Sequence, residues 1–327
     1  MNLHLQTLLQ TLTDGIAVGS LYALIALGYT LVFGILQFIN FAHGDVFALG
    51  AWLTCSVATY IIKLATEVVD ESGTLLHPWL AAHPLVMAFI VPIVVVSLCA
   101  IVGFAIERLA YRPLRSAPRL NVLITAIGVS LLLENAGQHP KAFGTQPQPV
   151  PVLIPDHVLG SISGVQFHLT DVAVFVIAVM LMAAMQLLIF RTKFGMAMRA
   201  VSFNVKTAAL MGINVDRIIS LTFVLGSALA GAAGYLFAMK YQQQQLLQTA
   251  DPVWILLGMK AFVAAVVGGI GNVRGAVLGG ILIGLIENFG VQYLSSNYRD
   301  VYVFVVLILV LLVRPAGLLG KALVEKV

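Results

Sequence analysis

Long apolar stretches alternate with short polar segments along almost the whole chain. Each stretch is continuously apolar, which is typical of helices that cross a membrane, whereas the strands of a transmembrane barrel alternate polar and apolar residues. A spanning helix needs about 20 mostly apolar residues. About nine stretches approach or reach that length, and they lie near residues 14–36, 46–63, 84–106, 120–136, 170–190, 218–240, 254–271, 275–294 and 301–313.

The composition agrees with this pattern. The 327 residues are 60% hydrophobic and only 10% charged, and the mean hydropathy is +0.99. A soluble globular chain carries roughly 25% charged residues, so too few charges are present to cover a water-exposed surface of this size. The sequence therefore predicts an all-α, polytopic transmembrane bundle of about 8–9 spans that forms one domain over residues 1–327.

The charges between the stretches predict which segments face the cytoplasm. Cytoplasmic loops are enriched in Lys and Arg, and residues 108–119, residues 191–217 and the tail from Arg314 carry clusters of them. The acidic segment 64–83 and the Pro-rich segment 137–169 carry hardly any. We expect the first three segments, and with them the C-terminus, inside, and the other two outside; the N-terminal segment has no Lys or Arg with which to test its side.

Several chemistries are excluded or disfavoured by missing motifs. The two cysteines, Cys55 and Cys99, both lie within apolar stretches and form neither a metal site nor a disulfide framework. No G-x-x-x-x-G-K-[ST] phosphate-binding loop and no H-E-x-x-H or G-x-S-x-G motif occurs. The net charge of +4 is small and gives no indication of nucleic-acid binding. An enzyme is not predicted, and neither a cofactor nor a metal is expected.

The first candidate for a solute contact is a polar break between two apolar stretches, Asn40 to Asp45. Non-helical backbone at membrane depth is tolerated only beside protein or a water-filled cavity. The segment can therefore be part of a passage, or it can be an ordinary connection in which His43 and Asp45 pair and fix a turn. The residues alone leave both interpretations open.

Ionisable and amide side chains inside a span usually face the interior of a bundle. Glu287, beside Asn288, is placed deep in its stretch, and lining a passage and packing are equally consistent with it. Glu107 adjoins Arg108, so we expect a structural ion pair there.

The basic segment 191–217 contains a candidate amphipathic helix at about 196–211, which Gly212 can end. Such a helix lies on the membrane surface or docks into a groove of a cytoplasmic partner. The sequence does not separate these two roles.

Four segments, in this order, resemble the permeases of branched-chain amino-acid ABC importers of the LivH-like type. They are GSLYALIALGYTLVFGILQFINFAHGD near the N-terminus, AALMGINVDR in the basic segment, GMKAFVAAVVGGIGNVRGAVLGG, and the closing VLLVRPAGLLG. INFAHGD and VVGGIGNVRGA are fairly specific to the wider family and less specific for its substrates. The resemblance extends over nearly the whole chain.

The resemblance implies an ABC importer permease fold in a bacterial-type inner membrane and a set of partners. These are a second homologous permease, two cytoplasmic ATPase subunits that bind the ATP, and a periplasmic or extracellular solute-binding protein. The segment 191–217 would contain the coupling helix, although Thr207 stands where an acidic residue is common and the spacing to Gly212 is one residue shorter. The implied coupling residues are Lys206, Thr207, Ala208, Ala209, Gly212 and Asn214.

Resemblance and polarity together indicate Asn40, His43 and Asp45 as candidates for the solute pathway, with Tyr22 and Tyr29 as weaker ones. Glu287 is a further candidate because of its polarity and its depth in the span. Alternatives within the wider family are permeases for urea, amides or aromatic acids. Outside the family they are a passive channel and a proton-coupled secondary transporter that titrates Asp45, His43 or Glu287.

Overall fold

The computed structural model describes residues 3–66, 84–115, 117–162, 164–242 and 252–320. Most of the acidic segment 64–83 and the tail from residue 321 lie outside the described residues. The described residues are mostly helical, and the α-helices follow in the order α1 Leu3–Leu36, α2 Ala42–Thr66, α4 Pro84–Ile106, α5 Arg119–Gln138, α6 Leu169–Arg191, α7 Lys193–Phe203, α8 Val205–Leu210, α9 Val215–Lys240, α10 Pro252–Gly268, α11 Val273–Tyr293 and α12 Arg299–Val313.

The predicted spans are confirmed as helices. Among the described residues, 8 helices are long and apolar enough to cross a membrane, and α10 contributes a shorter apolar segment, Leu256–Gly268. Continuous apolar sequence favours helices because every backbone group can then be hydrogen-bonded within its own segment. The first helix is longer than predicted, since α1 begins at Leu3 and not near residue 14.

Two parts of the connecting segments differ from the prediction. The single helix expected at 196–211 is two helices, α7 and α8, because Asn204 leaves the helical conformation and its side chain accepts a hydrogen bond from the backbone of Thr207. The segment 137–169 contains an antiparallel hairpin that was not predicted, formed by β1 Val158–Ile162 and β2 Val165–His168.

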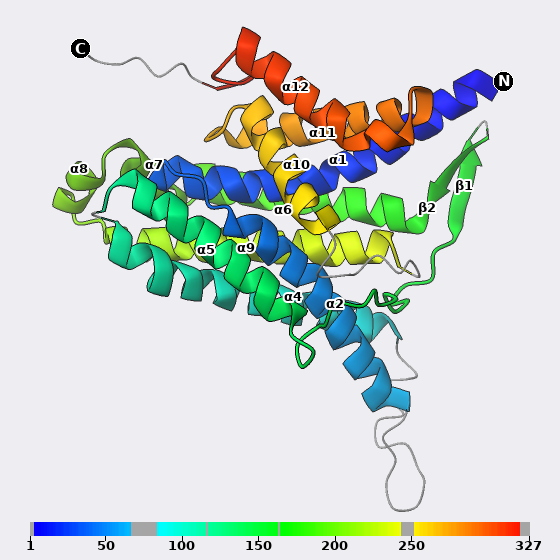
Figure 1. The fold of residues 1–327 in the computed structure, drawn as a ribbon, viewed down its shortest axis with the longest axis horizontal. Helices are drawn as coiled ribbons and strands as arrows, with labels where there is room; N and C mark the ends of the chain where they lie inside the picture. The colour runs from blue at the N-terminus through cyan, green and yellow to red at the C-terminus, as the bar shows by residue number, and fades with distance from the viewer. Residues whose placement is uncertain (1–2, 67–83, 116, 163, 243–251, 321–327) are drawn as a thin grey trace, which may run out of the picture.

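Helices α1, α6 and α9 lie roughly along one direction, with two distinct ends, while α2 and α10 run obliquely to them (Figure 1). We call the end that carries β1, β2 and the start of α1 the hairpin end, and the opposite one, from which α7 and α8 project, the α8 end. Helix α1 packs along α11 and also contacts α9, α10 and α6, while α2 and α4 pack on α9. In the most apolar 18-residue stretch of each helix, 83% of the residues of α1 and 72% of those of α9 are buried, against 17% for α5 and 6% for α12. Helices α1 and α9 therefore form the centre of the bundle, and α5 and α12 its periphery.

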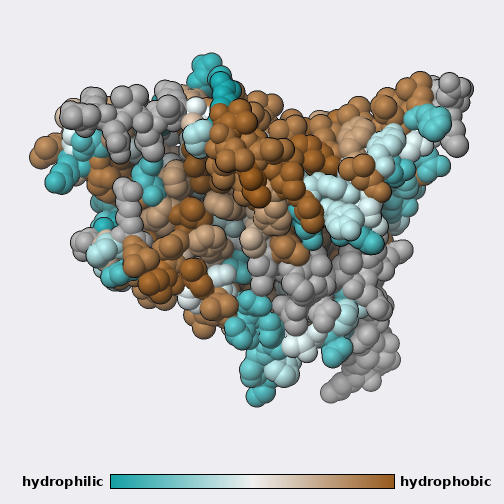
Figure 2. Space-filling view, turned by 45° about the horizontal axis from the view of Figure 1, so that its top comes forward, coloured by the Kyte–Doolittle hydropathy of each residue, from teal (hydrophilic) through white to brown (hydrophobic). Residues whose placement is uncertain are grey.

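The surface matches a protein surrounded by lipid. Apolar side chains cover much of the middle of the face in Figure 2, and polar ones gather towards its margins. The peripheral helices expose large apolar residues, such as Leu120 (63%) and Leu132 (66%) on α5 and Leu312 (76%) on α12. A contiguous apolar surface of this extent indicates a membrane or a subunit interface.

Small residues allow the central helices to approach closely. A Cβ on Gly280 of α11 would overlap the backbone of Ala23 on α1, and one on Gly284 would overlap the backbone of Gly19. Glycines four residues apart are a common interface between membrane helices. The spacing of Gly280 and Gly284 therefore allows α1 and α11 to pack closely.

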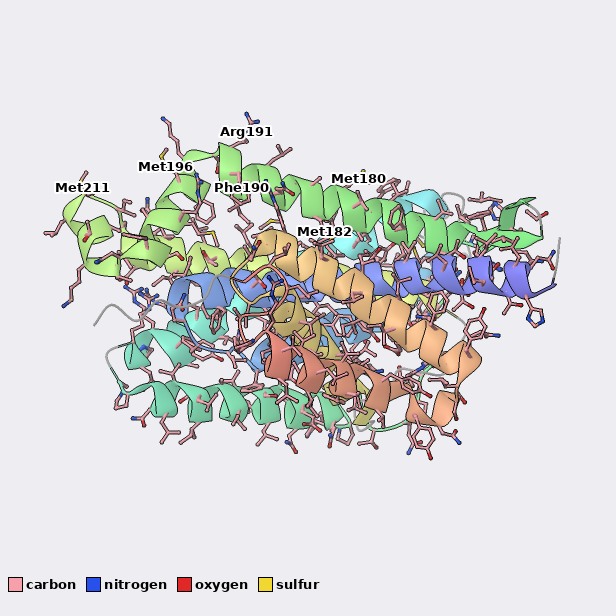
Figure 3. The ribbon with its side chains drawn as sticks, turned by 90° about the horizontal axis from the view of Figure 1, so that it is seen from above. Met180, Met182, Phe190, Arg191, Met196 and Met211 are labelled. Carbon is pink, nitrogen blue, oxygen red and sulfur yellow. The ribbon has the colours of Figure 1, made fainter. Side chains whose placement is uncertain are left out.

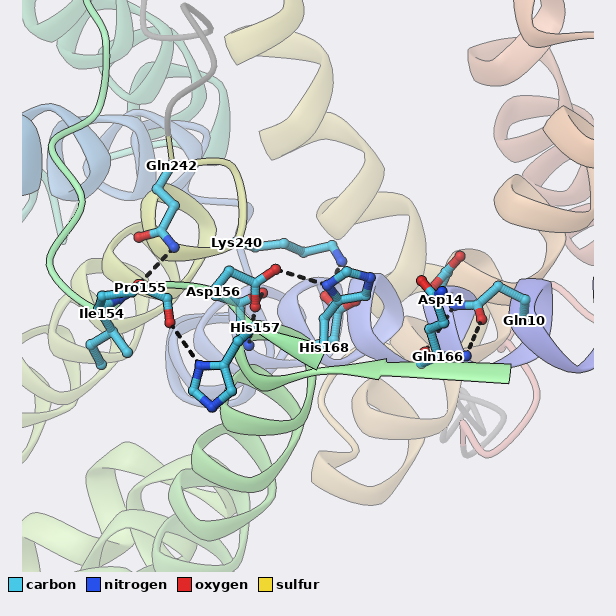
Figure 4. A network of polar contacts seen from close by, with 12 residues as sticks. Gln10, Asp14, Ile154, Pro155, Asp156, His157, Gln166, His168, Lys240 and Gln242 are labelled. Atoms are coloured by element: carbon cyan, nitrogen blue, oxygen red, sulfur yellow. Dashed lines mark hydrogen bonds and ion pairs between the residues drawn. The ribbon is translucent and has the colours of Figure 1, made fainter. Parts of the chain in front are cut away.

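Polar contacts attach the hairpin to the bundle (Figure 4). The backbone N–H of Gln166 in β2 donates to the side chain of Gln10 in α1 at 3.0 Å. Asp156 accepts hydrogen bonds from the backbone N–H and the hydroxyl of Thr170, at 3.1 and 3.0 Å, and contacts His168 at 2.8 Å. Partial burial raises the pKa of the Asp156 carboxyl, but these contacts outweigh it and hold the pKa below its ordinary value. Asp156 thereby caps the start of α6 from the preceding loop.

Candidate functional site

A buried hydrogen bond joins the first transmembrane helix to α11. The hydroxyl of Tyr22 donates to Oε2 of Glu287 at 2.7 Å, and the two residues are 3% and 4% exposed. Lys260 of α10, also 3% exposed, donates to Oε1 of the same carboxylate at 3.1 Å. A buried carboxylate needs such partners, because an unpaired charge costs several kcal/mol in a low-dielectric interior.

The charge cluster extends to α12. Lys260 Nζ lies 2.6 Å from Asp300 Oδ1, and Arg299 Nε lies 3.5 Å from Glu287 Oε1. Tyr22, Glu287, Lys260 and Asp300 thus connect α1, α11, α10 and α12, and we call these four residues the charge cluster. Sequence reasoning found Glu287 and Tyr22 and missed Lys260, although a lone lysine within an apolar stretch was a usable signal.

The polar break at Asn40 to Asp45 is shorter than predicted. Helix α2 begins at Ala42, so His43 and Asp45 lie in its first turn and only Gln37–Phe41 is non-helical. The backbone N–H of His43 donates to the carbonyl of Asn40 at 3.1 Å, which closes the start of the helix. The break is therefore a tight connection between α1 and α2.

His43 and Asp45 point to different neighbours and do not form the pair considered above. The Asp45 carboxylate accepts a hydrogen bond from Ser130 of α5, and Asn40 accepts one from the hydroxyl of Tyr111 at 2.6 Å. These partners come from segments 71 to 85 residues away in the sequence. The two polar residues thus join α2 and the preceding turn to α5 and to the end of α4.

His43 is packed into the junction of α1, α2 and α10. It is 1% exposed, and its Nε2 has no hydrogen-bond partner. The ring lies directly against Gly28, where a Cβ would overlap it, and meets Tyr29 edge-on with ring centroids 4.7 Å apart. Phe262 of α10 also meets Tyr29 edge-on, with ring centroids 5.8 Å apart. We call His43, Tyr29 and Phe262 the aromatic cluster.

The six pathway candidates therefore fall into separate groups and do not form one binding site. Tyr22 and Tyr29 are seven residues apart on α1, which corresponds to about 10 Å along a helix. Tyr22 and Glu287 belong to the charge cluster, Tyr29 and His43 to the aromatic cluster, and Asn40 and Asp45 to polar contacts beside it. All are close-packed in this conformation.

A cavity of about 520 Å³ opens at the α8 end, between the end of α1, α6, α7, the α10–α11 turn and the segment after α12. Two segments that carried the family resemblance meet here, because the N–H groups of Leu318 and Leu319 donate to the carbonyls of Val267 and Gly268 at 2.8 and 3.0 Å. Thr30 lines the cavity; it is 1% exposed, and its hydroxyl has no partner.

The segment of the implied coupling residues has well-defined helix ends. The backbone of Ile213 donates to Ala208 and that of Gly212 to Ala209, at 3.1 and 3.0 Å. Gly212 has φ +82°, so these bonds form the glycine-terminated helix end known as a Schellman motif. Asn214 then accepts from the backbone of Arg217 and caps α9. Gly212 ends the helix as predicted, and Ala208 is buried while Lys206, Thr207 and Ala209 are exposed.

The tip of this segment exposes large apolar side chains that sequence reasoning missed. Phe203 is 93% exposed, Leu210 88% and Met211 77%. Figure 3 shows Met211 at the far tip of α8, beyond the ends of the long helices. None of the described residues covers these side chains, and an exposed apolar tip of this kind indicates a docking surface.

Glu107 also differs from its prediction. It is fully buried and pairs with Arg115, not with the adjacent Arg108, and it accepts a hydrogen bond from Ser220 of α9. A π-helical turn at Glu107–Tyr111 and a 3-10 turn at Arg112–Leu114 separate Glu107 from Arg115. Among the described residues, no group of His, Cys, Asp or Glu is arranged to hold a metal ion.

The fold and these sites define the class of the protein as a polytopic helical membrane permease. Residues 11–312 match the family described as "Branched-chain amino acid transport system / permease component", and the chain belongs to that family.

Similar proteins support this assignment. The chain is 41% identical to a high-affinity branched-chain amino acid transport system permease protein, BraD, of Pseudomonas aeruginosa, with 98% of each chain covered. It is 39% identical to the LivH protein of Salmonella typhimurium, which carries the same description, over 98% of this chain and 97% of that one. It is 31% identical to a probable branched-chain amino acid transport permease protein, LivH, of Methanocaldococcus jannaschii, over 94% of this chain and 91% of that one. No solved structure gives a significant match to the chain.

Proposed function

We propose that the chain is the membrane-spanning permease subunit of an ATP-binding-cassette importer and that it moves branched-chain amino acids. The observation that carries the proposal is the family match over residues 11–312, at 41% identity to a relative described by that activity. The match favours this function over a proton-coupled transporter. The match also favours branched-chain amino acids over urea, amides or aromatic acids as the solute, because the relatives described above are named for branched-chain amino acids.

In the proposed assembly, a second homologous permease completes the passage. Two ATPase subunits bind at the α8 end, and a soluble binding protein delivers the solute at the hairpin end. The basic segments and the C-terminus then lie on the cytoplasmic side of the inner membrane, in accordance with the excess of Lys and Arg at the α8 end. ATP is bound by the ATPase subunits, and this chain holds no cofactor.

The exposed tip of α8 supports the docking part of the proposal. Phe203 precedes the short helix α8, while Leu210 ends it and Met211 follows, so exposed apolar side chains lie at both ends of α8, the type of element that inserts into a groove of a partner. The hydrogen bonds of the Schellman motif and of the Asn214 cap connect α8 firmly to α9. A displacement of α8 by the ATPases would therefore be passed to α9, which contacts α1, α2 and α4.

The passage itself is proposed to run along α1, where the aromatic and charge clusters lie. In this conformation the aromatic cluster closes the junction of α1, α2 and α10, because the ring of Tyr29 contacts those of both His43 and Phe262. Opening then requires α2 or α10 to move away from α1. The polar atoms left without partners, His43 Nε2 and the hydroxyl of Thr30, are the groups that a polar solute could contact after that movement.

Purification in mild detergent from the native host tests the assembly. The proposal predicts that a second permease and two ATPase subunits co-purify with the chain, and that Leu210→Asp removes the ATPases while the second permease stays bound. The matched control is Leu159→Asp at the hairpin end, where Leu159 is also exposed (52%). Recovery of the chain alone, with solute uptake driven by a proton gradient in vesicles without ATP, would contradict the importer.

A further inference from the structure

A second cavity at the α8 end has three arginines and one acidic residue, Asp216, in its lining. It has a volume of about 340 Å³ and lies between the end of α4, the turns that follow it and the first turns of α9. Its lining includes Phe104, Arg108, Arg112, Arg217, Ser220 and Leu221.

The acidic groups of this region are already paired. Asp216 contacts both Arg112 and Arg115, and the buried Glu107 contacts Arg115 and Ser220. Four arginines (108, 112, 115 and 217) thus face two acids, which leaves an excess of two positive charges. Arg108 and Arg217 have no acidic partner among the described residues, and both are exposed at the mouth of the cavity.

The helix faces above these two arginines are apolar. Ile101 and Phe104 are three residues apart on one face at the end of α4, and Arg108 follows in the π-helical turn and lines the cavity together with Phe104. Leu221 and Arg217 are four residues apart on α9. Ile101 is 62%, Phe104 45% and Leu221 41% exposed, and all three lie on spanning helices. Each stripe therefore passes from a surface suited to acyl chains to an arginine at the edge of the membrane.

We propose that this cavity binds the headgroup of an anionic phospholipid, such as phosphatidylglycerol, in the leaflet at the α8 end. A guanidinium group forms paired, charge-assisted hydrogen bonds with a phosphate. Basic pockets between transmembrane helices at this depth suit anionic headgroups. The apolar stripes favour a lipid over an acidic segment of a partner protein, because they continue from the arginines into the membrane-spanning part of α4 and α9. The bound lipid would link the turns after α4 to α9, beside the α8 coupling segment.

The test uses the complex as it is purified from membranes that contain equal parts of phosphatidylglycerol and phosphatidylcholine. Native mass spectrometry counts the lipids that stay bound to the wild type, to Arg108→Gln/Arg217→Gln and to Arg274→Gln. Arg274 is the matched control, because it is exposed at the same end, has no acidic partner among the described residues and does not line the cavity. The double variant removes no contact seen in the structure, and an unchanged melting temperature and elution volume would verify its fold.

The proposal predicts that the wild type and Arg274→Gln retain phosphatidylglycerol in preference to phosphatidylcholine. Retention by the double variant should fall by at least about tenfold, as expected for the loss of two cations near a membrane surface. Equal retention by the double variant and the wild type would overturn the proposal. So would equally strong binding of soluble glycerol 3-phosphate, which has no acyl chains. Loss of the ATPase subunits with unchanged lipid retention would assign the arginines to a protein partner instead and would equally overturn it.

Discussion

The hydroxyl of Tyr22 donates a hydrogen bond to the carboxylate of Glu287 at 2.7 Å, although the two residues are 265 positions apart in the sequence. This contact joins the central helix α1 to α11 inside the bundle. Lys260 completes the pairing of the same carboxylate from α10. The arrangement of α1, α10 and α11 therefore depends on a few polar side chains as well as on glycine packing.

Tyr22→Phe should destabilise the protein without changing its shape. The substitution removes one hydrogen bond from a buried carboxylate, which costs about 1–3 kcal/mol. Thermal unfolding of the protein in nanodiscs would measure the loss. Tyr60→Phe on α2 is the control, because Tyr60 is 64% exposed; an equal effect of the two variants would rule out a special role for the Tyr22 contact.

Lys260→Met should be more harmful than the double variant Lys260→Met/Glu287→Gln. The single change leaves the buried Glu287 charge poorly compensated, and breaking a buried pair in this way costs about 3–5 kcal/mol. The double change removes both charges and should recover a large part of that loss. A double-mutant cycle on the unfolding free energy would measure the coupling. Additive effects would show that the two charges do not interact.

Gly28→Ala should disrupt the junction of α1, α2 and α10. The added methyl group would overlap the His43 ring, and overpacking of a core typically costs about 1–3 kcal/mol. His43→Ala in the same chain should relieve much of this cost by removing the ring. The yield of folded protein and its thermal stability are the measurements, and Gly34→Ala is the control, because a Cβ there would have no neighbour within 4 Å. A double variant no better than Gly28→Ala would contradict the packing described.

Acidification should loosen the start of α6 at the hairpin end. The pKa of Asp156 is held below its ordinary value, so its contribution to stability is present above the ordinary carboxyl range and is lost as the pH falls through the lowered value. Below about pH 4, the ordinary carboxyl pKa, the protection of the Thr170 N–H against hydrogen exchange, taken relative to the intrinsic exchange rate at each pH, should therefore fall. In Asp156→Asn this protection should be low already at neutral pH and should depend little on acid. A protection of Thr170 in the wild type that stays constant on acidification would contradict this capping role.

The sequence predicted the fold class and the spans well, because continuous apolar stretches of sufficient length leave few alternatives to helices in lipid. It also predicted the end of α8 at Gly212, where a left-handed backbone favours glycine. The partners of the polar side chains could not be predicted. Glu107 pairs with Arg115 and not with its neighbour Arg108, and Asp45 bonds to Ser130 and not to His43, because tertiary packing decides which side chains face one another.

The separation of the pathway candidates into several groups is a further result that periodicity could not give. Asn40, His43 and Asp45 are close in the sequence, yet Asn40 bonds to Tyr111, Asp45 to Ser130, and His43 packs on Gly28 and Tyr29. A polar cluster in a membrane sequence thus serves as a set of helix-joining contacts in this conformation.

The most direct test of the account is ATP-driven uptake of leucine into proteoliposomes that contain the purified assembly. The binding protein is supplied on the side of the hairpin end, and ATP on the side of the α8 end. The account predicts ATP-driven uptake by the wild type. Leu210→Asp should abolish uptake while leaving the permease folded, because it places a charge in the apolar surface proposed to dock on the ATPases. Full ATP-driven uptake by Leu210→Asp, or uptake by the wild type that needs no ATP, would contradict the account.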